Sequence, residues 1–193
     1  MNLTESLRAS LALPPRDGLP AGDLIEGAPD AGQQAAVLVA ITDRPAPRVI
    51  LAVRREHLCT HARQVSFPGG RLDPGEDAVA AALREAEEEI GLPPAEVAVW
   101  GMADPYRTVT GFVVTPVLGL VPPDLPLASH EHEVAEWFEA PLSFLLDPAN
   151  QQRMTAEFQG RTRHYYQIDW QAPRIWAATA AMLVNLSRRL DWA

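Results

Sequence analysis

The sequence has little cysteine, no long apolar run and no excess of positive charge. Its 193 residues include one cysteine, Cys59, so no disulfide can form within the chain, and a reducing, cytoplasmic location is expected. No stretch approaches the roughly 20 apolar residues of a membrane span, and the first residues lack the basic and apolar pattern of a secretory signal. The formal net charge of -9 disfavours nucleic acids and anionic membranes as partners, because both attract basic surfaces.

The composition is that of a globular protein. Hydrophobic residues make up 47% of the chain and charged residues 21%, which predicts one domain with a sizeable core. We place this domain at residues 34–193. Residues 1–33 are expected to form an N-terminal arm, with a short helix at 1–13 followed by a linker rich in proline and glycine.

The apolar pattern predicts strands mixed with two long helices. The expected strands are residues 34–42, 48–54, 64–67, 96–102, 112–121, 133–138 and 163–168. The expected helices are 77–90 and 174–189, with a short third helix at 141–146. This order predicts an α/β fold in which a mixed sheet is covered by helices on both faces.

The helix predicted at 77–90 follows a glycine-rich stretch at residues 69–76 and carries clustered acids. Asp77 can accept a hydrogen bond from a first-turn N–H, and Gly91 supplies a left-handed residue that ends the helix. Glu85, Glu88 and Glu89 gather on one face, where like charges repel by about 0.2–0.5 kcal/mol per pair. A solvated acidic face is one interpretation and a divalent metal site is the other. We favour the metal site, because local rules tend to be broken at functional sites.

Gly70, Glu76 and the run Arg84–Leu92 resemble the Nudix box, Gly-x5-Glu-x7-Arg-Glu-U-x-Glu-Glu-x-Gly-U, in which U is an apolar residue. Every specified position of this pattern is filled across residues 70–92, which makes the resemblance highly specific. It implies a Nudix hydrolase with an α/β/α sandwich fold built on a mixed β-sheet. It also implies that the substrate is a nucleoside diphosphate linked to another group, and that the cofactor is Mg²⁺ or Mn²⁺.

The same resemblance gives the box residues expected roles in catalysis. The implied metal ligands are three carboxylates and one backbone carbonyl, those of Glu85, Glu88, Glu89 and Gly70. Arg84 would hold the acids in orientation through charge-assisted hydrogen bonds, and Glu76 would support it.

The general base is either a box glutamate or a carboxylate from a distant loop. The segment Ser129–Glu133 has two histidines and two glutamates, and Glu131 and Glu133 are the catalytic candidates there. The His-x-His spacing of this segment also permits a zinc site. A solvent-facing polar loop is the third interpretation, which we rank above zinc.

A second resemblance lies upstream of the box. Residues 50–70 are similar to the signature of the coenzyme A pyrophosphatase branch, approximately Leu-Leu-Thr-x-Arg-Ser-x-x-Leu-Arg-x-His-x-Gly-x-Val-x-Phe-Pro-Gly-Gly. The matching positions are Arg54, Leu58, His61, Val65 and residues 67–70. The departures are Ala52, Arg55, Cys59 and Arg63, where the branch has Thr, Ser, Arg and Gly. Residues 175–180, Ile-Trp-Ala-Ala-Thr-Ala, also resemble the branch's Ile-Trp-Gly-Ala-Thr-Ala.

The two resemblances together imply hydrolysis of coenzyme A or its thioesters to adenosine 3′,5′-bisphosphate and 4′-phosphopantetheine or its acyl derivative. The candidate residues for binding this small-molecule substrate are Arg54, His61, Arg63 and Phe67. One alternative is a Nudix hydrolase of ADP-ribose, dinucleotides or another nucleoside diphosphate derivative. A non-catalytic Nudix-fold binding module is a further alternative, which the complete set of box acids disfavours. The oligomeric state is left open.

Arg63 gives a prediction about specificity. It stands where the branch has glycine and lies close in sequence to Cys59, where the branch has arginine, so we expect it to compensate for the missing cation. A charge-assisted contact to the 3′-phosphate of coenzyme A corresponds to about a tenfold to hundredfold effect on kcat/KM. Arg63→Ala should therefore lose that efficiency on coenzyme A and change little on dephospho-coenzyme A. Equal losses on both substrates would place Arg63 at the pyrophosphate instead.

Overall fold

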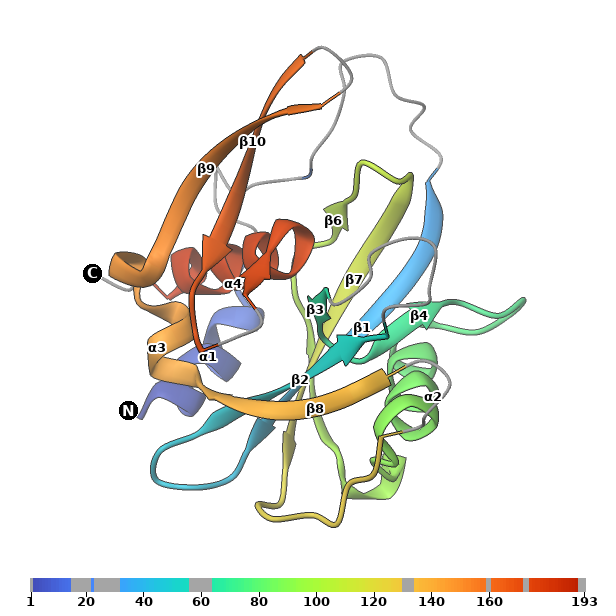
Figure 1. Cartoon of the computed structure of the whole chain (residues 1–193). Helices are drawn as coiled ribbons and strands as arrows, with labels where there is room; N and C mark the ends of the chain where they lie inside the picture. Colours follow the sequence, from blue (N-terminus) through green and yellow to red (C-terminus); the bar gives the residue numbers. More distant parts are fainter. Residues whose placement is uncertain are drawn as a thin grey trace.

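The structure of the protein is a computed structural model (Figure 1), and it describes residues 2–14, 22, 32–55, 64–129, 134–158, 161–171 and 174–190. The helices are α1 (Leu3–Leu11), α2 (Ala78–Ile90), α3 (Leu142–Leu146) and α4 (Ala177–Arg189), with short 3-10 turns at Pro94–Glu96 and Pro148–Asn150. The strands are β1 (Gln33–Thr42), β2 (Arg48–Arg54), β3 (Val65–Ser66), β4 (Gly69–Arg71), β5 (Ala98–Met102), β6 (Tyr106–Arg107), β7 (Phe112–Val121), β8 (Val134–Pro141), β9 (Gln151–Phe158), β10 (Arg161–Ile168) and β11 (Ile175–Trp176).

The main sheet is mixed and has β1 near its centre. Its backbone order is β3-β2-β1-β7-β5, while β4 pairs with β1, β6 with β7, and β8 with β2. Strands β1 and β7 run parallel over their full length, and the other pairs in the sheet are antiparallel. The expected α/β fold with a mixed sheet is therefore confirmed.

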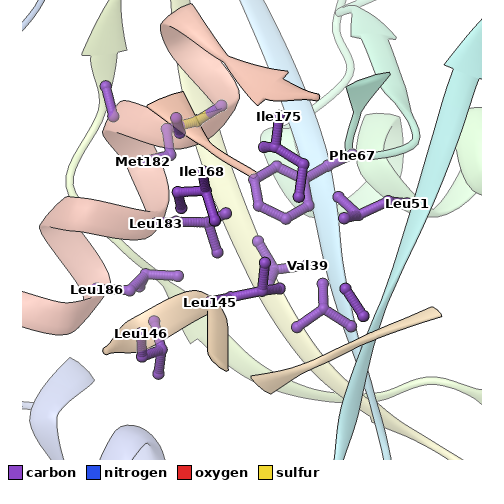
Figure 2. Close-up of a cluster of buried hydrophobic side chains, with 14 of the residues drawn as sticks. Val39, Leu51, Phe67, Leu145, Leu146, Ile168, Ile175, Met182, Leu183 and Leu186 are labelled. Atoms are coloured by element: carbon purple, nitrogen blue, oxygen red, sulfur yellow. The ribbon is translucent and has the colours of Figure 1, made fainter. Parts of the chain in front are cut away.

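Helices cover both faces of this sheet, which explains why β1 is apolar at nearly every position. Alternate residues of a strand point to opposite faces. Ala36, Leu38 and Ala40 of β1 pack in the cluster that includes α2. Val39 and Ile41 pack in the larger cluster that includes residues of α3 and α4 (Figure 2). Since both faces are buried, a continuous apolar run replaces the usual alternation of apolar and polar residues.

Helix α2 begins and ends as the sequence predicts. The Asp77 carboxylate accepts a hydrogen bond from the backbone N–H of Ala80, and Gly91 closes the helix in the left-handed conformation with φ of 66°. The buried face is made largely of small residues, since Ala81, Ala82 and Ala86 have no exposed surface. Alanine lets the helix axis approach the sheet closely, so the acids at the end of α2 come near the strands.

The N-terminal helix α1 packs against the main body of the fold. Leu7 is fully buried and belongs to the larger core cluster. Arg189, near the end of α4, donates through Nη1 to the backbone carbonyls of Ser10 and Leu13, at 2.7 and 3.2 Å. The same guanidinium forms a two-point ion pair with Asp104, in which Nη2 lies 2.8 Å from Oδ1. One buried arginine therefore joins α1, α4 and the segment after β5.

Two expectations about the C-terminal part of the chain are corrected. The helix expected at 174–189 starts at Ala177, because Ile175 and Trp176 form β11. Strand β9 was not expected, and it pairs with β10 in a separate antiparallel sheet of order β11-β10-β9. The β9–β10 pair extends away from the main sheet, above α4 in Figure 1. A short strand, β6, lies between the expected strands at 96–102 and 112–121 and was also not expected.

No helix within the described ranges is long and apolar enough to cross a membrane.

The Arg189–Asp104 pair gives a prediction about stability. Arg189→Met should lower the free energy of unfolding by about 3–5 kcal/mol, because it leaves the Asp104 carboxylate nearly buried without its partner. Urea unfolding monitored by circular dichroism measures this loss. Arg153→Met, at an exposed position of β9, is the matched control and should change stability by less than about 0.5 kcal/mol. A similar small change for Arg189→Met would show that the pair contributes little.

Candidate active site

The glycine-rich strand β4 and helix α2 meet closely enough that a side chain at residue 70 would displace the Glu85 carboxylate. A Cβ atom built on Gly70 would overlap the carboxylate of Glu85. Residue 69 is more tightly constrained, since a Cβ on Gly69 would overlap the backbone of β1 at Ala36 and Val37, which cannot move aside. The pairing of β4 with β1 thus places the Gly70 backbone beside the first of the three clustered glutamates.

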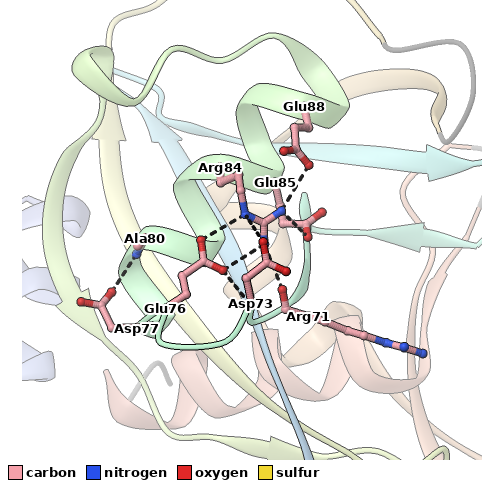
Figure 3. Close-up of polar contacts among 8 residues, drawn as sticks. All are labelled: Arg71, Asp73, Glu76, Asp77, Ala80, Arg84, Glu85 and Glu88. Atoms are coloured by element: carbon pink, nitrogen blue, oxygen red, sulfur yellow. Dashed lines mark hydrogen bonds and ion pairs between the residues drawn. The ribbon is translucent and has the colours of Figure 1, made fainter.

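Arg84 lies at the centre of a network of acids (Figure 3). Its Nε and Nη2 each donate to one oxygen of Glu76, both at 3.0 Å. Its Nη1 donates to Glu85 at 2.9 Å and to Glu88 at 3.2 Å. Nη2 also donates to the backbone carbonyl of Arg71 at 3.0 Å. The guanidinium therefore connects the loop before α2 to two of the clustered acids, and its orienting role in catalysis stays a prediction.

This network shifts the pKa of both members of its strongest pair. The hydrogen bonds from Arg84, followed by the one from the backbone N–H of Asp73, lower the pKa of Glu76 below its ordinary value of 4.5. The hydrogen bond to Glu76, reinforced by Glu85, raises the pKa of Arg84. Both groups are consequently charged throughout the neutral pH range, and the pair holds the loop against the helix.

Glu89 differs from the other two clustered glutamates. Its side chain is nearly buried, with 4% of its surface exposed, whereas the Glu88 side chain is 61% exposed. Glu89 Oε2 accepts a hydrogen bond of 3.1 Å from the backbone N–H of Gly69. The contact fixes the glycine turn to the helix, a role that the sequence did not indicate for this residue.

Within the ranges that the structure describes, no group of three or more His, Cys, Asp or Glu side chains is arranged to hold a metal ion. The physical reason lies in the contacts already described. Glu85 and Glu88 both accept from Arg84, and Glu89 accepts from Gly69. Arg84 therefore offsets part of the repulsion between these glutamates, which was our reason for expecting a metal. The assignment of Gly70, Glu85, Glu88 and Glu89 as ligands stays a prediction.

The candidate substrate residues are only partly described. Arg54 ends β2, is half-buried, and donates its backbone N–H to the carbonyl of Gln64 at 3.0 Å. The expectation that Phe67 binds substrate is corrected. Its side chain is 1% exposed and lies in the core near Leu51 and Ile175 (Figure 2), so it has no surface for a ligand. The remaining predicted site residues, His61, Arg63, Glu131 and Glu133, lie outside the described residues, as does Cys59.

A comparison with protein-family profiles identifies the chain. The profile described as the NUDIX domain matches residues 32–158, about two thirds of the sequence. The chain belongs to the Nudix family. It is therefore a Nudix hydrolase, in a family of enzymes that act on phosphoanhydride bonds and generally use divalent metal ions such as Mg²⁺ or Mn²⁺.

Relatives and solved structures agree with this family. The chain is 41% identical over 159 residues to the uncharacterized Nudix hydrolase NudL of Escherichia coli K12, covering 82% of this chain and 83% of that protein. NudL of Shigella boydii matches with the same identity and coverage. A MutT/nudix family protein from Enterococcus faecalis aligns with a TM-score of 0.52 at 15% identity, covering 99% of this chain and 70% of that one. A Caenorhabditis elegans Ap4A hydrolase complex aligns with a TM-score of 0.50 at 22% identity, covering 56% and 80%. The two structures support the fold alone.

The lowered pKa of Glu76 gives a prediction about pH. A carboxylate whose pKa is depressed in the folded state adds stability that is present above its unfolded pKa and is lost as pH falls through the folded value. Without divalent metal, Glu76→Gln should therefore be less stable than the wild type at pH 7, and the difference should shrink below about pH 4.5. Urea midpoints between pH 3 and pH 7 measure this. A difference that is constant with pH would mean that the charge of Glu76 has no part in it.

Proposed function

We propose that this Nudix hydrolase cleaves the pyrophosphate of coenzyme A or its thioesters, giving adenosine 3′,5′-bisphosphate and 4′-phosphopantetheine or its acyl derivative. The observation that carries this proposal is the signature at residues 50–70, which runs directly into the Arg84 network. In the structure the two strands within this signature pair with each other, Val53 of β2 with Val65 of β3. This pairing supports the proposal, because β3 leads directly to Gly69 and Gly70.

The acids of α2 are suited in kind to a divalent cation. Carboxylate and backbone carbonyl oxygens are the hard ligands that Mg²⁺ and Mn²⁺ prefer. Glu88 is largely exposed, and Glu85, which lies against Gly70, keeps 14% of its side chain exposed, so both carboxylates border solvent. The metal, when bound, supplies charge neutralisation at the diphosphate and acidifies the attacking water.

Arg84 can release these acids without leaving its place. It holds Glu76 through Nε and Nη2, whereas Glu85 and Glu88 share only Nη1. If the Glu85 and Glu88 carboxylates rotated toward a cation, only the contacts of Nη1 would break. The two hydrogen bonds between Arg84 and Glu76 would remain. We infer that Glu76 anchors Arg84 in both the metal-free and the metal-bound protein, and that Glu85, Glu88, Glu89 and Gly70 hold the cation.

A substrate screen tests the proposal. Purified protein is incubated with coenzyme A, ADP-ribose, NADH and diadenosine tetraphosphate, each with Mg²⁺ and with Mn²⁺, and phosphorylated products are quantified. The proposal expects coenzyme A or a thioester to give the highest kcat/KM. Preference for ADP-ribose or a dinucleotide would support the alternative Nudix activity. The absence of turnover of all four substrates, together with no metal binding by calorimetry, would support a non-catalytic module.

Glu88 provides a test of the metal-binding helix. Glu88→Gln should lower kcat at least about a hundredfold, by analogy with the loss of a key electrostatic stabiliser. Because the Glu88 side chain is largely exposed, the metal-free melting temperature should change little. Mg²⁺ or Mn²⁺ should raise the melting temperature of the wild type, since a ligand bound only by the native state stabilises it, and should raise that of Glu88→Gln less.

Glu87→Gln is the matched control, because Glu87 lies on the same helix and is exposed but is not a candidate ligand. It should keep wild-type turnover. Near-wild-type activity of Glu88→Gln would remove Glu88 from the ligand set.

A further inference from the structure

Strand β9 forms one edge of the small sheet β11-β10-β9. It pairs with β10 along all eight of its residues, and among the described residues no strand pairs with its other side. Edge strands present unpaired N–H and C=O groups, which proteins commonly protect with prolines or bulges. Strand β5, at an edge of the main sheet, has such a register shift between Val99 and Gly101. Strand β9 has neither a proline nor a register shift, so its edge is regular enough to receive another strand.

The charges of β9 are arranged so that the strand complements itself. Arg153 and Glu157 are four residues apart, so their side chains lie on the same face of the sheet, with Thr155 midway between them. All three residues are exposed. If two β9 strands pair antiparallel about Thr155, each Arg153 lies directly opposite the Glu157 of the other strand. Opposite charges in this position stabilise a strand pair, whereas a parallel pair in register would place like charges opposite each other.

The other face of the sheet is apolar up to this edge. Met154 of β9 lies opposite Tyr165 of β10, and the Tyr165 ring meets Trp176 of β11 edge to face, with centroids 5.9 Å apart. Met154 and Tyr165 are half-buried, and Trp176 is 37% exposed. In an antiparallel pair about Thr155, Met154 lies opposite the Ala156 of the second strand. The apolar row of one copy would therefore continue into that of the other, and surface that a single chain leaves in water would be buried.

The β9–β10 hairpin is fixed at its base and extends away from the main sheet (Figure 1). Ile168, at the base of the hairpin, is fully buried in the core. The side-chain amides of Asn150 and Gln151 donate to the backbone carbonyls of Phe144 and Leu145 in α3, both at 3.0 Å. Because these contacts already order the strand, pairing with a second chain would cost little further conformational entropy.

We propose that β9 is a homodimer interface, in which two copies of the chain pair their β9 strands antiparallel about a two-fold axis at Thr155. The two small sheets then form one sheet of order β11-β10-β9-β9-β10-β11. The contact between Arg153 and Glu157 forms twice, as an isologous interface requires. The Glu157 carboxylate can accept from several donors, so this contact adds to those within its own chain. A second copy is the occupant because the charge pattern complements itself. The proposal does not depend on which substrate the enzyme cleaves.

Charge reversal tests the interface. Sedimentation velocity on the full-length protein, from about 1 µM to about 1 mM, measures the dimer dissociation constant in the range expected for a small interface. Arg153→Glu and Glu157→Arg each place like charges opposite each other at two symmetry-related positions, so each should raise this constant at least about tenfold. The double variant exchanges the two charges and should return the constant to within about threefold of the wild type. Glu136→Arg, at an exposed position of β8, is the control and should leave the constant unchanged.

A disulfide tests the position of the axis. In a Cys59→Ser background, Thr155→Cys places two thiols on the axis, where the Cα atoms of opposed residues lie about 4.5–5.5 Å apart, a distance that a disulfide can span. Mild oxidation should give a covalent dimer on a non-reducing gel. Gln152→Cys is the matched control, because it is also exposed on β9 but lies three residues from the axis. The proposed register separates its two copies by roughly 20 Å, so it should not crosslink.

The outcomes decide the proposal in either direction. A chain that stays monomeric up to the highest concentration would overturn it, as would a dimer that neither single reversal weakens. A dimer that both reversals weaken and the double variant does not restore would overturn the antiparallel register. Circular dichroism checks that each variant is folded. If a charge variant is not folded, the crosslinks decide: a covalent dimer of Thr155→Cys but not of Gln152→Cys supports the interface, and equal crosslinking of the two, or none, overturns it.

Discussion

The candidate site depends on the two-point contact between Arg84 and Glu76. Helix α2 places like charges at the spacings where they repel, near a helix C-terminus whose dipole also disfavours them. Arg84 offsets this because Nη1 touches Glu85 and Glu88, while the other donors are held by Glu76 and by the Arg71 carbonyl. An arginine is suited to the task, since its planar fork binds several oxygens in a fixed geometry and stays charged.

The position of this network follows from the way in which the sheet is buried. Strand β1 is covered on both faces, so it has no freedom to shift register without exposing one apolar set. Its antiparallel pairing with β4 fixes Gly69 and Gly70, and the alanines of α2 allow the helix to lie close beside them. The contact between the Gly70 backbone and the Glu85 carboxylate is therefore set by packing of the core rather than by any interaction within the site.

The sequence predicted the elements whose signal is local and missed those created by tertiary contacts. The apolar run of β7 and the capped helix α2 were placed correctly, because their periodicity and end signals lie within the segment itself. Strand β9 is polar and largely exposed, so it carries no alternating pattern to detect. Ile175 and Trp176 continue the apolar pattern of the final helix, and only the positive φ of Ala177 separates them from it. In the candidate site, the resemblance pointed to Arg84 and the acids, and their roles stay predictions, whereas the hydrogen bond of Glu89 to Gly69 depends on folded geometry.

The two sheets have different roles because they are stabilised differently. The main sheet is buried on both faces and fixes β4 beside α2, which carries the residues that we propose to act on the diphosphate. The small sheet is anchored on one face by Ile168 and Ile175 and leaves aromatic and amide groups on the other. A family whose members share one reaction and differ in substrate is expected to vary in such a half-covered element, where a substitution changes the surface offered to a ligand without disturbing the core. The hydrogen bond from Thr179 to Val65 joins the first turn of α4, which follows the small sheet, to β3 of the main sheet.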